Sequence, residues 1–299
     1  MRLITKITAF AVVNLTMATL TANGAPGDLF ASVNGAIENG AGFIYEYTPD
    51  GVQSTFASGL SRPRGLAFDS MDNLFVATNF CDADCHPTIL EFAPDGTQTL
   101  FATLDDKFFA QGVAIDGSDN TFVLETFQLN RSLIYKITPD GQRTAFGVFR
   151  GQAFDLDFDS AGNLFAADSG HVTIYEFAPD GTRSVFVGHK AFNKFTQGPI
   201  GLAFDQFGNL FVSTEVFPFT DDQILKFTPS GVRNRFANGL ASPRGLAFDS
   251  AGNLFVAEIP PSAAGDILKF TPDGMRTVFA SGIGDPQGNG GPEYLAIQP

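Results

Sequence analysis

The sequence predicts an all-β protein built as a six-bladed β-propeller, and three observations support this fold class. A unit of roughly 40 to 50 residues recurs along the chain, which is the period of propeller blades. Each unit contains short strand signals separated by turn residues. The chain also has 33 Phe and no Trp, as expected if one large ring recurs in each unit and packs between neighbouring blades.

The first two strands of each unit are the clearest part of the repeat. The segment from Pro243 to Glu258 reads PRGLAFDSAGNLFVAE. Its first half recurs, intact or altered, at Gly65, Gly112, Asp155, Gly201 and Tyr294, and its second half at Asp28, Asn73, Asn120, Asn163 and Asn209. Gly and Ala dominate the first strand, which suits a place where six blades crowd around an axis.

Two further strands complete each unit. A strand of the IYEF type begins at Ile44, Ile89, Ile134, Ile174, Ile224 and Ile267 and ends in a TPDG, APDG or TPSG turn. Pro presets φ and Gly accepts positive φ, so these are turns between antiparallel strands. The fourth strands end in Phe56, Phe101, Phe146, Phe186, Phe236 and Phe279. A two-sheet sandwich is the rival fold, but it gives no reason for six near-identical units.

The phase of the repeats predicts how the ring closes. The repeats begin at a second strand, Asp28 to Val33, and end at a first strand, Glu293 to Gln298. The closing blade should therefore take its innermost strand from the C-terminal segment and its outer three strands from residues 28 to 57. This pairing removes an open sheet edge.

Charge and the N-terminal residues bear on location and partners. The net charge of −14 and the pI near 4.4 disfavour a nucleic-acid partner. Arg2 and Lys6 precede a mostly apolar run over residues 7–20, and Ala22-Asn23-Gly24 offers a cleavage site before Ala25. We expect a signal peptide over residues 1–24, a propeller over 25–299, and a secreted or periplasmic monomer without a membrane span.

The two cysteines, Cys81 and Cys85, lie four residues apart and are followed by His86. In an exported protein a local disulfide is the expected pairing. A metal site formed with His86 and an Asp is the alternative, but the second Cys/His pair of a zinc site is missing.

The loops predict which face of the propeller is used. The first-to-second and third-to-fourth turns are short and uniform, whereas the other connections vary: 34–42, 79–87, 103–110, 188–199, 259–265 and 281–291. In a four-stranded antiparallel blade the variable connections emerge on one face, where binding usually resides. Arg64, Glu125 and Arg244 on that face are the candidate ligand-binding residues.

Acidic residues near the same face raise the question of a metal ion. Asp168, Glu215 and Glu258 lie at or near the ends of second strands, and Asp155 and Asp157 replace Gly and Ala on the innermost strand of the third unit. The two carboxylates of Asp155 and Asp157, near a crowded axis, need partners. Either Ca²⁺ or Mg²⁺ binds them, or they form ion pairs with Arg64 and Arg244.

Histidines are the remaining candidates for chemistry. His171 and His189 lie in variable connections, where we expect solvated loop histidines. Either could instead act as a general base near the axis, so both are weak catalytic candidates. The motifs of familiar hydrolases and nucleotide-binding proteins are absent from the sequence.

The repeated pattern P-x-G-L-A-F-D-S-x-G-N-L-F-V-A-[DE] resembles the NHL repeat. It is similar to the wider class of six-bladed propellers that includes SMP-30/gluconolactonase-like and streptogramin-lyase-like proteins, over about residues 27–298. NHL repeats commonly mediate binding. Gluconolactonase-like members hold a divalent metal near the central channel, a part that the resemblance assigns by position to Asp157, Asp168, Glu215 and Glu258.

Two functions are therefore open. The first is an exported propeller that binds a small molecule, glycan or protein at the loop face and channel mouth. The second is a divalent-metal-dependent hydrolase or lyase, in which the cation polarises a carbonyl and His171 or an acid moves a proton. The sequence slightly favours binding, because no catalytic set is complete.

Overall fold

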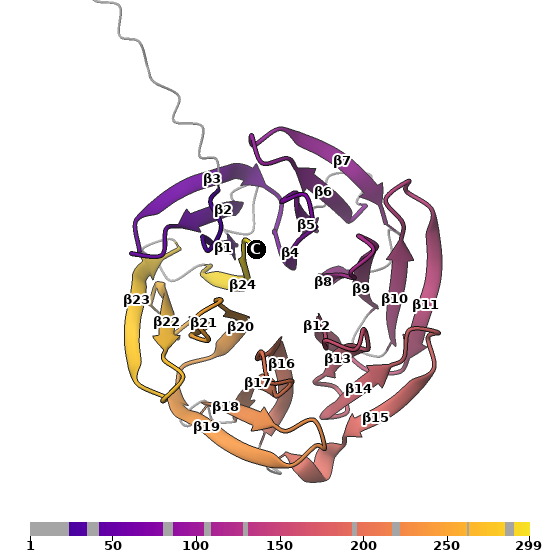
Figure 1. The fold of residues 1–299 in the computed structure, drawn as a ribbon, viewed down its shortest axis with the longest axis vertical. Helices are drawn as coiled ribbons and strands as arrows, with labels where there is room; N and C mark the ends of the chain where they lie inside the picture. Colours follow the sequence, from indigo (N-terminus) through magenta and orange to yellow (C-terminus); the bar gives the residue numbers. More distant parts are fainter. Residues whose placement is uncertain are drawn as a thin grey trace, which may run out of the picture.

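The structure, a computed structural model, confirms the six-bladed propeller. It describes residues 24–34, 42–79, 86–104, 109–127, 131–192, 196–216, 222–261, 263–284 and 290–299. Six antiparallel sheets of four strands each surround a central axis (Figure 1). Within the described residues, the only helix is the single 3₁₀ turn η1 (His189–Ala191).

The sheets follow the repeat units in chain order. Blade one contains β4 (Leu66–Phe68), β5 (Leu74–Thr78), β6 (Thr88–Phe92) and β7 (Gln98–Thr103). Blade two contains β8 (Phe109–Ile115), β9 (Thr121–Phe127), β10 (Arg131–Ile137) and β11 (Arg143–Phe149). Blade three contains β12 (Ala153–Phe158), β13 (Leu164–Asp168), β14 (Thr173–Phe177) and β15 (Arg183–Val187).

The second half of the ring repeats this order. Blade four contains β16 (Thr196–Phe204), β17 (Leu210–Val216), β18 (Asp222–Phe227) and β19 (Arg233–Leu240). Blade five contains β20 (Pro243–Phe248), β21 (Leu254–Glu258), β22 (Gly265–Phe270) and β23 (Arg276–Ile283). The closing blade contains β1 (Leu29–Val33), β2 (Gly42–Tyr47), β3 (Gln53–Leu60) and β24 (Pro292–Ile297).

The closing blade joins the two ends of the propeller as the repeat phase predicts. The strand order is β24-β1-β2-β3, with Leu29 opposite Ile297 and Ser32 opposite Tyr294. Beyond the strands, the N–H of Gly27 donates to the carbonyl of Gln298 at 2.9 Å, and the N–H of Gln298 donates to the carbonyl of Asp28 at 2.9 Å. The innermost strand thus comes from the opposite end of the chain.

Strand register defines two faces of the ring. In blade five, Pro243 pairs with Glu258 and Gly265 with Ile283 at one end, which we call the loop face. Phe248 pairs with Leu254 and Phe270 with Arg276 at the other end, the turn face. The variable connections therefore leave each blade on one face, as expected.

The turn face is held by a repeated Asp–Asn pair. In blade four the Oδ1 of Asp205 accepts the backbone N–H of Asn209 at 2.8 Å, and the side-chain amide of Asn209 donates to Asp205 Oδ2 at 2.8 Å. Lys226 approaches Asp205 Oδ2 at 3.2 Å and lies over the Phe211 ring. The first-to-second turns are thus cross-linked structural elements.

The core lies between blades and is built on second-strand Phe residues. Phe211 of β17 makes edge-on contacts with Phe236 of its own blade, 5.0 Å between centroids, and with Phe248 of blade five, 4.9 Å. Phe30 bridges its blade to blade one in the same way, and Phe165 bridges blade three to blade four. This confirms the expected ring stacking.

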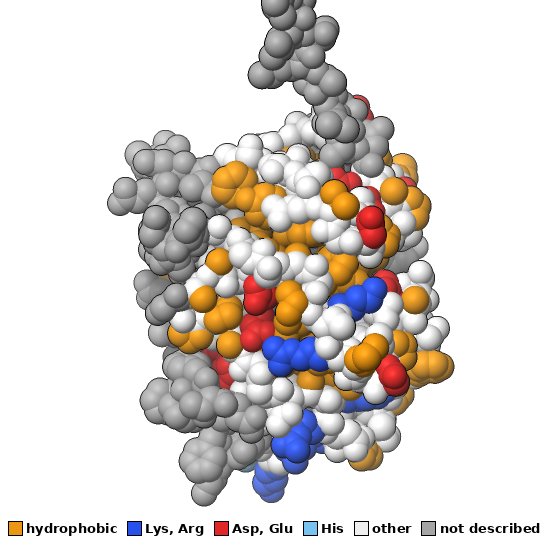
Figure 2. All heavy atoms as spheres, turned by 90° about the vertical axis from the view of Figure 1, so that its left-hand side faces the viewer, with side chains coloured by type: hydrophobic (Ala, Val, Ile, Leu, Met, Phe, Trp, Pro, Cys, Tyr) orange, Lys and Arg blue, Asp and Glu red, His pale blue; other side chains and the backbone are white. Residues whose placement is uncertain are grey.

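The outer surface of the ring has no comparable packing of hydrophobic side chains. On the side of β3 and β23, hydrophobic side chains are scattered among polar and charged ones (Figure 2). Val278 of β23 is exposed on this surface, and Val52 and Met275 are exposed in the third-to-fourth turns of the same two blades. Scattered exposure of this kind is ordinary for a folded protein.

Two sequence predictions concern residues that are wholly or mostly undescribed. The signal peptide over 1–24 lies outside the described residues except for Gly24, and Cys81 and Cys85 of the expected disulfide also lie outside them. Both stay predictions. In the described part of the chain, no helix is long and apolar enough to cross a membrane.

Candidate functional site

The innermost strands approach one another so closely that most carry glycine at one position. A Cβ added at Gly201 would lie 2.3 Å from the carbonyl oxygen of Arg244, and one at Gly245 would lie 2.6 Å from the Cα of Tyr294. Gly65 and Gly112 meet the next inner strand in the same way. At the matching position, blade three carries Asp155 and the closing blade carries Tyr294.

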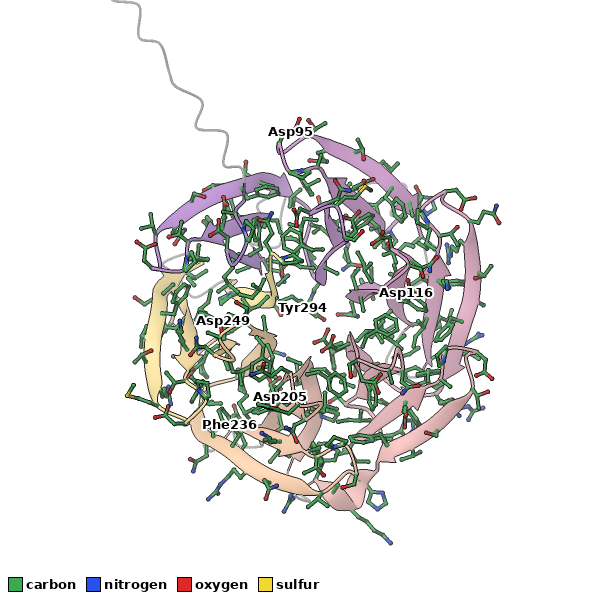
Figure 3. All side chains as sticks on the ribbon, in the orientation of Figure 1. Asp95, Asp116, Asp205, Phe236, Asp249 and Tyr294 are labelled. Atoms are coloured by element: carbon green, nitrogen blue, oxygen red, sulfur yellow. The ribbon has the colours of Figure 1, made fainter. Side chains whose placement is uncertain are left out.

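Tyr294 reaches across the central channel. Its hydroxyl donates to the carbonyl of Phe154 on β12, at 2.5 Å, although β24 and β12 belong to blades on opposite sides of the ring. Figure 3 shows Tyr294 near the axis, with Asp116, Asp205 and Asp249 farther out on the blades. The phenol ring therefore bridges the channel from one wall to the other.

The bridge separates a cavity on the turn side from a mouth on the loop side. The cavity holds about 300 Å³ and is lined by the turn-side halves of all six inner strands, together with Asp155, Asp157 and Tyr294. Arg244, at the start of β20, and Arg64, two residues before β4, lie beyond Tyr294 toward the loop face.

Asp155 and Asp157 bind the backbone of the neighbouring blade. Asp155 Oδ2 accepts the N–H of Leu202 at 2.9 Å, and Asp157 Oδ2 accepts the N–H of Phe204 at 3.0 Å. The other oxygen of each carboxyl accepts the N–H of the following residue. The predicted ion pairs with Arg64 and Arg244 are wrong, because both carboxyls face the edge of β16.

Burial in this channel changes how both acids titrate. It raises the pKa of Asp155 to about 8; the N–H of Leu202 lowers this pKa and the nearby Asp157 raises it. Burial also raises the pKa of Asp157 to about 7, against the N–H groups of Phe204 and Phe158. Asp155 therefore keeps its proton in most molecules at neutral pH.

The channel mouth holds two arginines on the loop side of Tyr294. Arg64 pairs with Glu293 at 3.2 Å, and Arg244 pairs with Glu215 at 3.0 Å. The two arginine side chains remain 28% and 29% exposed. Burial raises the pKa of Tyr294, as does Asp155, whereas Arg64 and Arg244 lower it, so these charges converge near the phenol.

Several buried polar atoms around this mouth lack a hydrogen-bond partner among the described residues. They are Asn34 Oδ1, Gln111 Oε1 and Arg244 Nε, from the closing blade, blade two and blade five. Asn34 is tied to the mouth through Glu293, to which its amide donates at 3.1 Å. Buried polar atoms are normally hydrogen-bonded to protein, water or ligand. These three atoms could therefore form hydrogen bonds with polar groups of a ligand.

The other predicted acids lie on separate blades and have other partners. Glu125 is wholly buried and pairs with Arg143 at 3.3 Å, so it does not face a ligand at the loop surface. Asp168 is wholly buried against His171. Glu258 accepts the N–H of Ala241 at 2.7 Å; burial raises its pKa, although that N–H and Arg276 lower it.

These residues do not fit the divalent metal that the resemblance implies. No group of three His, Cys, Asp or Glu side chains that could hold a metal ion occurs in the described part of the chain. Asp155 and Asp157 use their oxygens on backbone N–H groups, and Glu215 faces Arg244. The proposed ligands thus belong to different local networks.

Neither candidate histidine lies at the axis. His171 borders a groove with residues of the outer strands β11 and β15, and His189 is exposed in η1 after β15. Both are exposed, as expected for loop histidines, and the alternative of a base near the axis is wrong, since their connections leave the blade away from its innermost strand.

Sequence reasoning missed Tyr294, Glu293, Gln111 and Asn34 as members of the site. One signal was present: Tyr294 occupies the position where four units have Gly. A large polar side chain at a crowded axis indicates a group that fills or crosses the channel.

The fold is similar to that of several solved six-bladed propellers. A catalytically inactive variant of virginiamycin B lyase from Staphylococcus aureus, solved with quinupristin, matches at 14% identity and a TM-score of 0.59, over 87% of this chain and 93% of that chain. A putative gluconolactonase matches at 16% identity and a TM-score of 0.54, over 76% and 80%.

A third solved structure is the PQQ-bound aldose sugar dehydrogenase from Streptomyces coelicolor, with 17% identity and a TM-score of 0.55 over 85% of this chain and 86% of that chain. At such identities the likeness shows the fold alone. No protein-family model matches the sequence, and no curated protein sequence matches it.

Proposed function

We propose that the protein is an exported ligand-binding propeller that takes a small polar anion, such as a sugar acid, into the channel mouth. The observation that carries this proposal is the set of buried, unsatisfied polar atoms on Asn34, Gln111 and Arg244 around one opening. Export is inferred from the residue pattern of 1–24.

The chemistry of the mouth favours an anion that carries hydroxyl groups. Arg64 and Arg244 each have part of the guanidinium accessible beside their carboxylate partners, and guanidinium groups bind carboxylates well. The side-chain amide oxygens of Asn34 and Gln111 accept hydrogen bonds and could therefore bind hydroxyl groups of a ligand. Tyr294 forms the floor. A sugar-related ligand also agrees with two of the similar structures, a putative gluconolactonase and an aldose sugar dehydrogenase.

The test is calorimetric titration with gluconate, glucuronate and neutral glucose. We expect one sugar acid to bind and glucose to bind more weakly. Gln111→Leu should weaken binding about tenfold, as the loss of one hydrogen-bond partner does. Arg244→Gln should weaken it at least as much. Arg235→Gln, an exposed arginine on the outer strand β19, is the control for net charge.

Two results would overturn the proposal. One is that neither sugar acid binds to the wild-type protein. The other is that Gln111→Leu and Arg244→Gln bind as tightly as Arg235→Gln. Thermal melting of each variant checks that it folds, because Arg244→Gln leaves Glu215 without its ion-pair partner.

A second candidate function is a lyase or hydrolase that acts in the central channel. The reaction would take place in the cavity on the turn side of Tyr294, which Asp155 lines. The raised pKa of Asp155, about 8, makes it a proton donor there at neutral pH. Turnover of lactones and cyclic esters, followed by mass spectrometry, tests it. Activity that is lost in Asp155→Asn would favour catalysis over binding alone.

A further inference from the structure

A groove between blades two and three gathers positive side chains in a chain that is strongly acidic. It is lined by Arg131, Val148, Phe149 and Arg150 of blade two and by His171, Tyr175 and Arg183 of blade three, and it holds about 650 Å³. None of these lining residues is acidic, although the whole chain carries a net charge of −14. The groove lies away from the channel mouth and plays no part in the function proposed above.

His171 is positioned by a contact with the buried Asp168. Its Nδ1 lies 2.9 Å from Oδ2 of the wholly buried Asp168, while the imidazole itself is half exposed. Asp168 Oδ1 also accepts the N–H of Gln152 at 2.9 Å. Gly151, at φ 143°, makes room for this carboxylate, because a Cβ there would lie 2.0 Å from Asp168 Oδ2. The other ring nitrogen is therefore directed away from Asp168.

Arg183 is held in place as well. Its guanidinium donates to the carbonyl of Val148 at 3.2 Å and stacks over the Tyr175 ring at 4.8 Å. The Tyr175 ring in turn packs 5.0 Å from Phe149. A fixed guanidinium loses little conformational freedom when it binds an anion.

Two further arginines, Arg131 and Arg150, are exposed in the groove. No carboxylate of the described residues lies within ion-pair distance of either one, in contrast to Arg64, Arg143, Arg244 and Arg276. Unneutralised arginines beside a fixed arginine and histidine form a local positive field within a protein of opposite sign.

We propose that this arginine groove binds a small organic polyanion, with carboxylate or phosphate groups on a compact body. Arginines form paired hydrogen bonds with both kinds of oxyanion. The volume exceeds that of a single inorganic ion, and Val148, 55% exposed, offers an apolar surface for the body of the ligand. A long nucleic acid is disfavoured, because the rest of the acidic surface would repel it.

Calorimetric titration at an ionic strength of about 0.1 M, where the Debye length is about 10 Å, tests the groove with two polyanions, citrate and fructose 1,6-bisphosphate. Their single-group counterparts are acetate and inorganic phosphate. We expect at least one polyanion to bind more tightly than its single-group counterpart. The polyanion that binds more tightly shows whether the groove favours carboxylate or phosphate. Arg131→Gln and Arg150→Gln should each weaken binding about tenfold, as the loss of a charge-assisted hydrogen bond does.

Arg235→Gln removes the same charge from the outer strand of blade four and should leave polyanion affinity within about twofold, because exposed charges beyond a Debye length are screened. The proposal fails if neither polyanion binds better than its counterpart, or if Arg235→Gln weakens binding as much as the groove variants do. Arg131→Gln and Arg150→Gln should not change binding of sugar acids at the channel mouth, so the two sites are tested separately.

Discussion

At the residue scale, Asp155 and Asp157 show how acidic side chains persist near a crowded axis. Their carboxyl groups accept hydrogen bonds from the backbone of blade four, at Leu202 and Phe204. These bonds join two blades at a place where inner strands elsewhere approach through glycine. Burial still favours the protonated acid, because the bonds lower the pKa less than desolvation raises it.

The raised pKa of Asp155 predicts that the folded protein becomes less stable as pH rises. In the unfolded chain this group titrates near 3.8, and in the folded protein near 8. Between these values the unfolded chain has released its proton and the folded chain has kept it, so rising pH favours unfolding. The contribution of Asp155 to the free energy of unfolding is fully present below about pH 4 and is lost as pH rises to about 8.

Asp155→Asn removes this titration. Between pH 5 and pH 9, its Tm relative to wild type should rise by at least about 3 °C, the shift that about 1 kcal/mol produces in a large domain. Asp180→Asn is the matched control. Hydrogen bonds from Thr182 lower the pKa of Asp180, so its contribution is lost only in acid. A constant Tm difference for Asp155→Asn across this range would contradict the prediction.

At the element scale, the second strand of each blade connects neighbouring sheets. Its Phe contacts the fourth strand of its own blade, as Phe122 contacts Phe146, and often the first strand of the next blade, as Phe122 contacts Phe158. The hydrophobic clusters accordingly span adjacent blades instead of single sheets. A blade is thus stabilised by its neighbours.

Phe211→Ala should therefore destabilise the protein strongly. Phe211 is 3% exposed and has edge-on contacts with Phe236 and Phe248. Truncating a buried Phe costs about 3–5 kcal/mol, which urea unfolding measures. Phe207→Ala, at a position 75% exposed in the same blade, should change stability by less than about 0.5 kcal/mol. Equal losses in both variants would contradict the inter-blade role.

At the scale of the whole molecule, the ring depends on β24. This strand pairs with β1, carries Tyr294 across the channel and approaches the inner strand of blade five at Gly245. Without it, β1 would have an exposed edge and the channel would lose its bridge. The same strand therefore completes the sheet of the closing blade and supplies Tyr294 to the candidate site.

Removal of residues 294–299 should lower the Tm of the whole propeller in one cooperative transition, measured by circular dichroism. Removal of the exposed Pro299 alone should have no effect. A synthetic peptide of residues 290–299 should restore part of the lost Tm when added in excess, by mass action. An unchanged Tm after the longer deletion would show that β24 does not close the ring.

The fold could be predicted from the sequence because every unit repeats the same local rules. Turn residues, alternating strands and the recurrent Phe all indicated four-stranded blades, and the repeat phase indicated the origin of β24. These signals are local, and six copies reinforce one another. The structure confirms each of them.

The candidate site was harder to predict, because its contacts join segments distant in sequence. Arg64 and Arg244 lie at the mouth as expected, but their partners, Glu293 and Glu215, depend on the ring geometry. Asp155 looked like a metal ligand because its backbone partner at Leu202 has no sequence signature. Glu125, a predicted ligand-binding residue, lies two residues before the end of β9 and is wholly buried.

The closing blade also has a consequence for biosynthesis. Its strands β1–β3 are translated before every other blade, and β24 is translated after them all. At about 5–20 residues per second, the β1 edge waits on the order of ten seconds or more for its partner. The first blade to leave the ribosome is thus the last to be completed. A chain that stalls during translation would carry an unprotected strand edge, which is a template for aggregation.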